Sequence, residues 1–225
     1  MIKYNPAKPL ISLHIPKCAG RSLHKILKKW FAENFFTHYF QRLNALPQKY
    51  ELKPGICIHG HFNNTKGFGV QDYYPQVDQL ITFLRNPLEA AISNYFFWKK
   101  KGRYNQLKLG KINEGGEHDY RDINDFFEKR PLSHIQNFLP PDITGQNFKE
   151  VLTDRFVYIG IVEDMKTSLE ILARKLGFEP PQEIWINKSE RDEELTKKTE
   201  EKYIANNRFA FEIYEYALKT YKLLT

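Results

Sequence analysis

A short stretch near the amino terminus combines residue types that bind anions. It follows a mostly apolar run, Leu10–Ile15, and reads Pro16, Lys17, Cys18, Ala19, Gly20, Arg21, Ser22. From Ser22 onward apolar residues recur at helical spacing, so the pattern predicts a strand, a tight loop and the start of a helix. Such a start presents unpaired backbone N–H groups and the positive end of the helix dipole. We therefore expect a site for a terminal phosphate or sulfate group.

We expect the residues of this loop to have distinct roles in binding an anion. Ala19 and Gly20 keep it free of bulk, Ser22 offers a hydroxyl near the cap, and Lys17 supplies a mobile positive charge. The spacing is not GxxxxGK[ST], which disfavours a kinase or an ATPase. Only two residues separate Cys18 from Arg21, fewer than a cysteine phosphatase loop needs, so Cys18 is not expected to be a nucleophile. A plain strand–helix turn is the structural alternative.

A second segment, Leu84-Arg85-Asn86-Pro87, places an arginine at the end of a predicted strand, Gln79–Leu84. In a doubly wound sheet that edge is where ligands bind, and a guanidinium group can hold a phosphate with two hydrogen bonds. Ser93 lies about two helical turns further on and is a candidate second contact. The alternative is that Arg85 only caps the sheet edge while Ser93 packs against a neighbour.

A third segment holds two histidines, His59 and His61, at the end of the predicted strand Ile56–His59. Residues two apart in an extended chain point to one face. An imidazole is the side chain best suited to accept a hydroxyl proton near neutral pH, so either histidine is a candidate general base. A metal pair and two hydrogen-bonded core histidines are the alternatives; no third ligand at comparable spacing is evident, so no metal is expected.

The elements that must position these residues alternate between strand and helix. Helices are predicted around Gln41–Glu51, after Asn86-Pro87, and at Ile123–Lys129, Leu132–Phe138, Gln146–Leu152, Glu163–Leu176 and Glu193–Leu223, the last with a break near Asn206-Asn207. A further strand is predicted at Phe156–Ile161. This order predicts an α/β fold, a single domain over residues 1–225 with a mainly parallel central sheet flanked by helices. The stretch Lys99–Tyr120 is expected to be a long loop, serving as a lid or as part of an acceptor site.

Composition and charge narrow the class of protein. The chain has 225 residues, a net charge of +7 and only two cysteines, Cys18 and Cys57. No apolar run approaches the roughly 20 residues that a membrane helix needs, and no signal peptide is evident, so a soluble cytoplasmic protein is expected. The charge favours anionic partners, but the basic stretch Lys99–Lys111 lacks the interleaved aromatic residues of a nucleic-acid groove, so no nucleic acid is expected.

Taken in this order, the three segments resemble the sulfotransferase superfamily, specifically the carbohydrate branch with the heparan sulfate 2-O-sulfotransferases and their bacterial relatives. His14–Ser22 resembles the loop that binds the 5′-phosphosulfate of 3′-phosphoadenosine 5′-phosphosulfate (PAPS). Phe83–Glu89 with Ser93-Asn94-Tyr95 resembles the 3′-phosphate segment, and His59-Gly60-His61 resembles the paired histidines of the 2-O branch. Gly160–Asp164 and Ile186–Ser189 resemble later family segments less specifically. Arg21 stands where many relatives have Thr or Ser.

The resemblance implies a sulfotransferase that moves the sulfuryl group from PAPS to an acceptor hydroxyl, most readily a carbohydrate, leaving adenosine 3′,5′-bisphosphate. It assigns catalytic roles to His61, His59 and Lys17, with His61 as the base. Its expected nucleotide-binding residues are Lys17, Cys18, Ala19, Gly20, Arg21, Ser22, Arg85, Ser93, Lys188 and Ser189. A non-catalytic protein that binds polyanionic glycans or nucleic acid, and a nucleotide kinase, are the competing hypotheses. The acceptor and the oligomeric state are not predicted.

Overall fold

A parallel β-sheet forms the centre of the molecule. The computed structural model describes residues 1–40, 45–100, 120–182 and 191–225. In this part of the chain the strands are β1 (Leu10–Leu13), β2 (Phe35–His38), β3 (Cys57–Gly60), β4 (Leu80–Leu84) and β5 (Phe156–Ile161). They lie in the order β2-β3-β1-β4-β5, and every neighbouring pair is parallel. Every residue of β1, β3, β4 and β5 is buried, as expected for strands covered on both faces.

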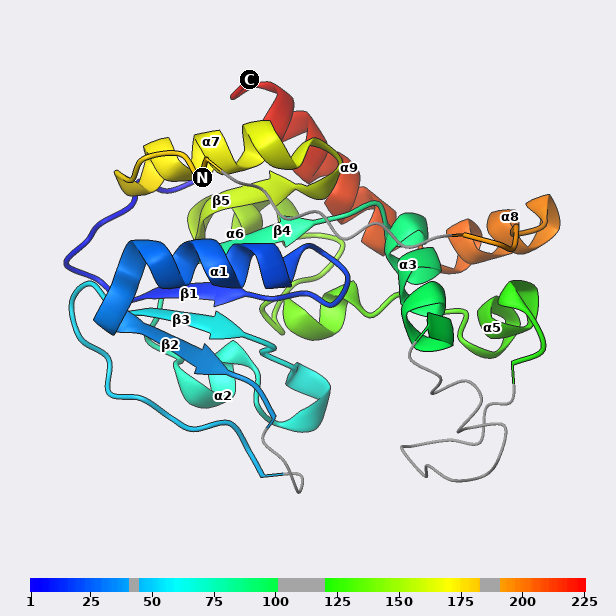
Figure 1. Cartoon of the computed structure of the whole chain (residues 1–225), viewed down its shortest axis with the longest axis horizontal. Coiled ribbons are helices and arrows are strands. Elements are labelled where there is room, and N and C mark those ends of the chain that lie inside the picture. Colours follow the sequence, from blue (N-terminus) through cyan, green and yellow to red (C-terminus); the bar gives the residue numbers. More distant parts are fainter. Residues whose placement is uncertain (41–44, 101–119, 183–190) are drawn as a thin grey trace.

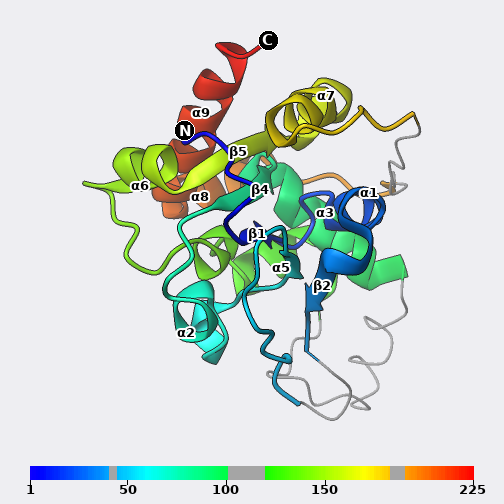
Figure 2. The same ribbon diagram turned by 90° about the vertical axis from the view of Figure 1, so that its left-hand side faces the viewer.

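Helices cover both faces of the sheet. Figure 2 shows α1 (Gly20–Phe31) and α7 (Met165–Leu176) on one side, and α6 (Phe148–Asp154) and α9 (Arg208–Lys222) on the other. In α1 the apolar residues Leu23, Ile26 and Leu27 are buried while Lys25, Lys28 and Lys29 face outward. This spacing is the amphipathic pattern that directs one side of a helix onto a sheet.

A smaller group of helices lies beyond the carboxyl ends of the strands. In Figure 1 the strand arrows point toward α3 (Pro87–Lys100), α5 (Ile123–Lys129) and α8 (Lys197–Asn206). These helices share their own hydrophobic cluster, whose buried members are Tyr95, Phe96, Tyr120, Ile123, Phe126, Phe127 and Tyr203. The short elements are α2 (Val70–Tyr73) and 3₁₀ turns at Ala32–Asn34, Asn64–Lys66, Ile135–Phe138 and Val162–Asp164.

The topology of the sheet indicates where a ligand binds. The chain leaves β1 for the β2–β3 side of the sheet, and later returns to place β4 on the opposite side of β1. In open parallel sheets such a reversal opens a crevice outside the carboxyl ends of the two central strands. The β1–α1 loop and the residues that follow β4 therefore form the expected ligand-binding edge.

The predicted fold class is confirmed, and its errors are local. The five-stranded sheet of the described residues is entirely parallel, and the break between α8 and α9 falls at Asn207. The helix predicted over Gln41–Glu51 is wrong for its described part, because residues 45–53 have no regular secondary structure. Pro47 explains the error, since proline inside a helix removes a hydrogen bond and clashes with the preceding turn.

Two further differences concern short elements. Leu132–Phe138, predicted as a helix, contains only a 3₁₀ turn at Ile135–Phe138. The edge strand β2 was not predicted, because its four residues are half-exposed for the most part and show neither a continuous apolar run nor alternation. Within the described ranges, no helix combines the length and the apolar character needed to cross a bilayer.

Candidate functional site

The β1–α1 loop has an unusual backbone conformation. Lys17 has φ 69° and Ala19, which caps α1, has φ 57°, both in the left-handed region that non-glycine residues seldom adopt. The Ala19 carbonyl accepts hydrogen bonds from the Ser22 and Leu23 N–H groups, and the Ile15 carbonyl accepts one from Cys18. Turns that include left-handed residues direct successive N–H groups toward one point and so form anion-binding concavities. The loop therefore has the backbone geometry of an anion site.

Gly20 is required at the first position of α1 by a close contact. A Cβ atom added there would lie 1.8 Å from the Cδ2 and Nε2 atoms of His14. The histidine ring thus packs directly against the first turn of the helix, and any larger residue at position 20 would displace one of the two. Because Gly20 has no side chain, both the His14 imidazole and a ligand can approach the start of the helix.

The charges near the start of α1 also favour an anion. The first turn carries no acidic residue, whereas Arg21 and Lys17 lie at or just before it. Cations at a helix amino terminus oppose the helix dipole by a few tenths of a kcal/mol or more, so this distribution disfavours the helix unless an anion binds. The Lys17 ammonium group lies 4.1 Å from the centre of the Phe97 ring on α3, which holds it beside the loop.

Cys18 does not offer a reactive thiol. Its side chain is 3% exposed and burial raises the pKa of the thiol to about 12. A thiol with such a pKa remains protonated at neutral pH and is a poor nucleophile. The structure therefore agrees with the sequence argument against a cysteine phosphatase.

The two histidines of the third segment have different environments. His59, on β3, is fully buried, and both of its ring nitrogens are hydrogen-bonded. Nε2–H donates to the Gly20 carbonyl at 3.2 Å, so Nδ1 accepts from the Ser12 hydroxyl at 2.9 Å. Burial, together with the nearby His24, lowers the pKa of His59 to about 3. His59 has no free lone pair and acts as a support beneath the start of α1.

His61 differs from His59 in the hydrogen bonds of its ring. Its Nδ1 lies 2.8 Å from the backbone oxygen of His14, and because a carbonyl only accepts, Nδ1 carries the hydrogen. Neutral His61 therefore keeps its lone pair on Nε2, the arrangement of a general base. The ring is only partly buried, and its backbone N–H is fixed to the His38 carbonyl at 2.9 Å. Burial lowers the pKa of His61, while the hydrogen bond to His14 raises it.

A third imidazole, which was not among the predicted site residues, lies between these two. The His14 ring stacks on His61 with centroids 4.2 Å apart and on His59 at 5.3 Å. Its Nδ1 is 2.8 Å from the hydroxyl of Tyr39. The row of rings joins β3 to the β1–α1 loop and places His61 beside the anion site.

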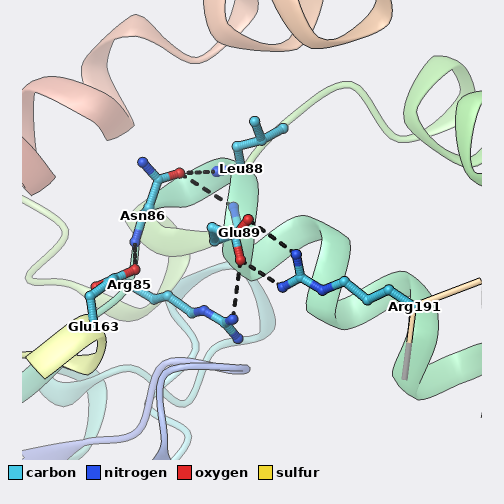
Figure 3. A network of polar contacts seen from close by, with 6 residues as sticks. All are labelled: Arg85, Asn86, Leu88, Glu89, Glu163 and Arg191. Carbon is cyan, nitrogen blue, oxygen red and sulfur yellow. Dashed lines mark hydrogen bonds and ion pairs between the residues drawn. The ribbon is translucent and has the colours of Figure 1, made fainter. Parts of the chain in front are cut away.

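Arg85 follows β4 and belongs to a network of charges. Its guanidinium group is 3.3 Å from the carboxylate of Glu89, one turn along α3 (Figure 3). Arg191 reaches the same carboxylate with two hydrogen bonds, of 2.6 and 3.3 Å, from a segment far along the chain. The hydrogen bonds from Arg191 lower the pKa of Glu89, and burial opposes them. Two guanidinium groups thus converge on one anionic group. Sequence reasoning missed Arg191, since nothing local links it to Arg85.

The start of α3 is fixed by the same segment. The Asn86 side-chain oxygen accepts from the Leu88 and Glu89 N–H groups at 3.0 and 3.3 Å, and its backbone N–H donates to Glu163 (Figure 3). This capping fixes the start of α3, and Arg85 just before it lines a pocket together with the β1–α1 loop. The lining residues that belong to these two segments are Ile15, Pro16, Lys17, Cys18, Arg85, Pro87, Ala90, Ala91 and Asn94.

The remaining predicted site residues either do not line this pocket or lie outside the residues that the structure describes. Ser93 is buried, at 8% exposure, and Asn94 lines the pocket in its place. Lys188 and Ser189 lie outside the described residues, as does most of Lys99–Lys111. Lys99 itself lies in the last turn of α3, where its ammonium group pairs with Asp192 and Glu193 at 2.6 and 2.7 Å. Among the described residues, no group of three or more His, Cys, Asp or Glu side chains is arranged to hold a metal ion.

Comparisons with known proteins found similar chains among solved structures. No protein-family model matches the sequence, and no curated protein matches it. Among solved structures, the chain is similar to mouse sulfotransferase SULT7A1 complexed with PAP, with 14% sequence identity and a TM-score of 0.39. That match covers 88% of this chain and 61% of the mouse chain, so this chain spans less than two thirds of the length of the mouse protein.

Proposed function

We propose that this chain is a sulfotransferase that moves the sulfuryl group of PAPS to a hydroxyl of an acceptor, with His61 as the general base. The observation that carries the proposal is the His61 ring beside the β1–α1 loop. Its Nδ1–H is committed to the His14 carbonyl, so Nε2 is available to accept a proton next to an anion site. The carbohydrate nature of the acceptor rests on the resemblance of His59-Gly60-His61 to the 2-O branch.

The residues divide the chemistry as follows. His61 Nε2 accepts the proton of the acceptor hydroxyl as the oxygen attacks sulfur in line with the leaving group. Lys17 and the N–H groups at the start of α1 stabilise the charge that develops on the 5′-phosphate as the sulfur–oxygen bond breaks. His59, with both nitrogens hydrogen-bonded, holds the Gly20 carbonyl and takes no part in proton transfer.

Arg85 and Arg191 supply the affinity for a second phosphate group. Both guanidinium groups face one carboxylate, that of Glu89. A 3′-phosphate binding beside them would replace Glu89 as their partner, and each charge-assisted hydrogen bond contributes about 1.5–3 kcal/mol. The nucleotide preference is therefore for a ribose that carries phosphate at the 3′ position.

Ligand-dependent unfolding tests the nucleotide site. Adenosine 3′,5′-bisphosphate at 100 times its dissociation constant should raise the melting temperature by about 5–10 °C, since it adds about 2.7 kcal/mol of stability. We expect a smaller shift from 5′-AMP and from ATP with magnesium. Arg85→Ala and Arg191→Ala should remove most of the difference between the bisphosphate and 5′-AMP. Arg155→Ala is the matched control, because Arg155 pairs with Asp142 outside the pocket.

Other results of the melting experiment, or of a binding measurement with heparin, would favour the competing functions. Equal shifts for the bisphosphate and 5′-AMP would remove the reason for a 3′-phosphate site. A larger shift with ATP and magnesium would favour a kinase. Salt-sensitive binding of heparin without any effect of nucleotide would favour a non-catalytic polyanion-binding protein.

Transfer itself is tested at His61. His61→Ala should retain nucleotide binding and lose between about 100- and 10,000-fold in turnover, the usual contribution of a positioned base. The measurement is transfer of ³⁵S from labelled PAPS to a mixture of desulfated glycans. A fully active His61→Ala variant would refute the assignment of the base, while leaving the nucleotide site intact.

A further inference from the structure

His14 lies between the anion site and the proposed base. It follows β1 directly, and its backbone N–H donates to the Gly60 carbonyl at 2.7 Å, so its position is fixed by the β1–β3 ladder. Its backbone oxygen holds His61 Nδ1, and its ring stacks on the His61 ring. A single residue thus contacts the base through both its backbone and its side chain.

The tautomer of His14 follows from its partner. Its Nδ1 faces the Tyr39 hydroxyl at 2.8 Å. A phenol is a stronger acid than a neutral imidazole N–H, and an imidazole nitrogen is a better acceptor than a phenol oxygen, so Tyr39 donates and Nδ1 accepts. The hydrogen of neutral His14 is then on Nε2. The two stacked rings have opposite tautomers: Nε2 of His61 accepts, and Nε2–H of His14 donates.

The donor edge of His14 points toward the start of α1. The Nε2 and Cδ2 atoms lie where the Cβ of residue 20 would be, and in a helix that bond is tilted toward the amino terminus. The same end of α1 is the helix amino terminus at which the candidate anion site lies. Burial lowers the pKa of His14 well below its ordinary value, and the neighbouring His61 and His59 lower it further, so the ring donates as a neutral group.

We propose that His14 is a further catalytic residue, whose Nε2–H donates a hydrogen bond to an oxygen of the sulfuryl group, with Tyr39 as the positioning residue that fixes its tautomer. This inference rests on the proposed sulfotransferase function. During transfer a bond forms between the acceptor oxygen and sulfur, and the bond between sulfur and the 5′-phosphate oxygen breaks with its electron pair. The acceptor proton goes to His61 Nε2. His14 keeps its proton throughout and stabilises the charge on the sulfuryl oxygens.

The test compares two ligands that differ only in the sulfuryl group. His14→Leu should weaken binding of PAPS about 10-fold and leave binding of adenosine 3′,5′-bisphosphate within about twofold, because only the first ligand offers the sulfuryl oxygen. Turnover should fall about 100-fold, as when one oxyanion donor is removed.

Two further variants test the hydrogen bond itself. His14→Gln carries an amide N–H near the position of Nε2 and should recover part of both losses. Tyr39→Phe should reduce turnover less than His14→Leu, with unchanged bisphosphate binding.

A matched control separates this role from packing. His24 lies on α1 with its ring edge-on to Phe35 and His59, and His24→Gln should leave the ratio of the two dissociation constants unchanged. If His14→Leu weakens both ligands equally, or if His14→Gln recovers nothing, His14 is a packing residue and the inference is overturned. If the wild-type chain binds neither ligand, the proposed function itself fails. The two failures are thus distinguishable.

Discussion

At the scale of single residues, hydrogen-bond partners decide which histidine can act. His59 and His61 are two positions apart, yet both ring nitrogens of the fully buried His59 are hydrogen-bonded, whereas within the described residues His61 is hydrogen-bonded only through Nδ1. The sequence places both at a strand end and leaves the choice of base open. The choice depends on the Gly20 and His14 carbonyls, whose positions are known only once β1, β3 and α1 are assembled.

The pKa of His61 gives a prediction for the pH dependence of transfer. A base must be unprotonated, and burial lowers the pKa of His61 from its ordinary value of 6.5. Activity should therefore persist as the pH falls below 6.5 and decline only when the lowered pKa is crossed. The measurement is kcat/KM for the acceptor between pH 4.5 and 8 at saturating PAPS. An acidic limb centred at pH 7 or above would contradict His61 as the base in this environment.

At the scale of elements, the β1–α1 loop stores strain. Lys17 and Ala19 have left-handed backbones, which cost non-glycine residues about 1–2 kcal/mol each. The surrounding ladder and helix hold this strained conformation, so the loop has a defined shape. A ligand that binds a shaped loop loses less entropy than one that must order it.

Ala19→Gly tests this view of the loop. Glycine relieves the left-handed strain but adds freedom to the unfolded chain, so the free energy of unfolding should change by less than about 1 kcal/mol. Affinity for adenosine 3′,5′-bisphosphate should fall several-fold, because the loop samples more conformations. Ala32→Gly is the control: Ala32 has φ 46° at the opposite end of α1. Unfolding in urea and calorimetric titration measure both quantities, and equal affinities in the two variants would refute the role of the strain.

Elements with a clear signal in their own residues were predictable from the sequence, whereas an element held by contacts with distant residues was not. Phe156–Ile161 and Ile123–Lys129 have the predicted bounds, because a continuous apolar run or a capped helix carries its own signal. β2 depends on pairing with β3, since Phe35–His38 has little periodicity of its own.

The same distinction holds for the site. The loop and Arg85 could be proposed as candidate site residues from short segments whose chemistry is local. Arg191 and Tyr39 could not, because their importance lies in side-chain contacts with Glu89 and His14 that neither segment encodes alone. Ser93, predicted from helical spacing, is buried, and its expected contact with phosphate stays a prediction.

At the scale of the whole molecule, buried histidines make stability depend on pH. Burial lowers the pKa of His59 to about 3 and that of His38 to about 4, so folding keeps both neutral, while the unfolded chain protonates them below about 6.5. The unfolded state then binds more protons, so the stability that these groups contribute is complete above pH 6.5 and declines as the pH falls toward their folded pKa values.

Urea unfolding at pH 7.5, 6.0 and 5.0 measures this loss. Each buried histidine that stays neutral should cost up to about 1.4 kcal/mol of unfolding free energy per pH unit once the unfolded chain is protonated. Carboxylates with lowered pKa values, such as Glu89 and Asp164, contribute mainly below this range. A free energy of unfolding that is constant from pH 7.5 to 5.0 would contradict the assignment of neutral, buried histidines.

The contact between Gly20 and the His14 ring makes two positions of the sequence depend on each other. Because a methyl group at residue 20 would overlap the imidazole, alanine is acceptable there only when residue 14 is small. The effects of Gly20→Ala and His14→Ala should therefore be non-additive, with the double variant more stable than the sum of the two single changes implies. In a lineage of related sequences, substitution at position 14 should precede substitution at position 20, because the reverse order passes through a sterically forbidden intermediate.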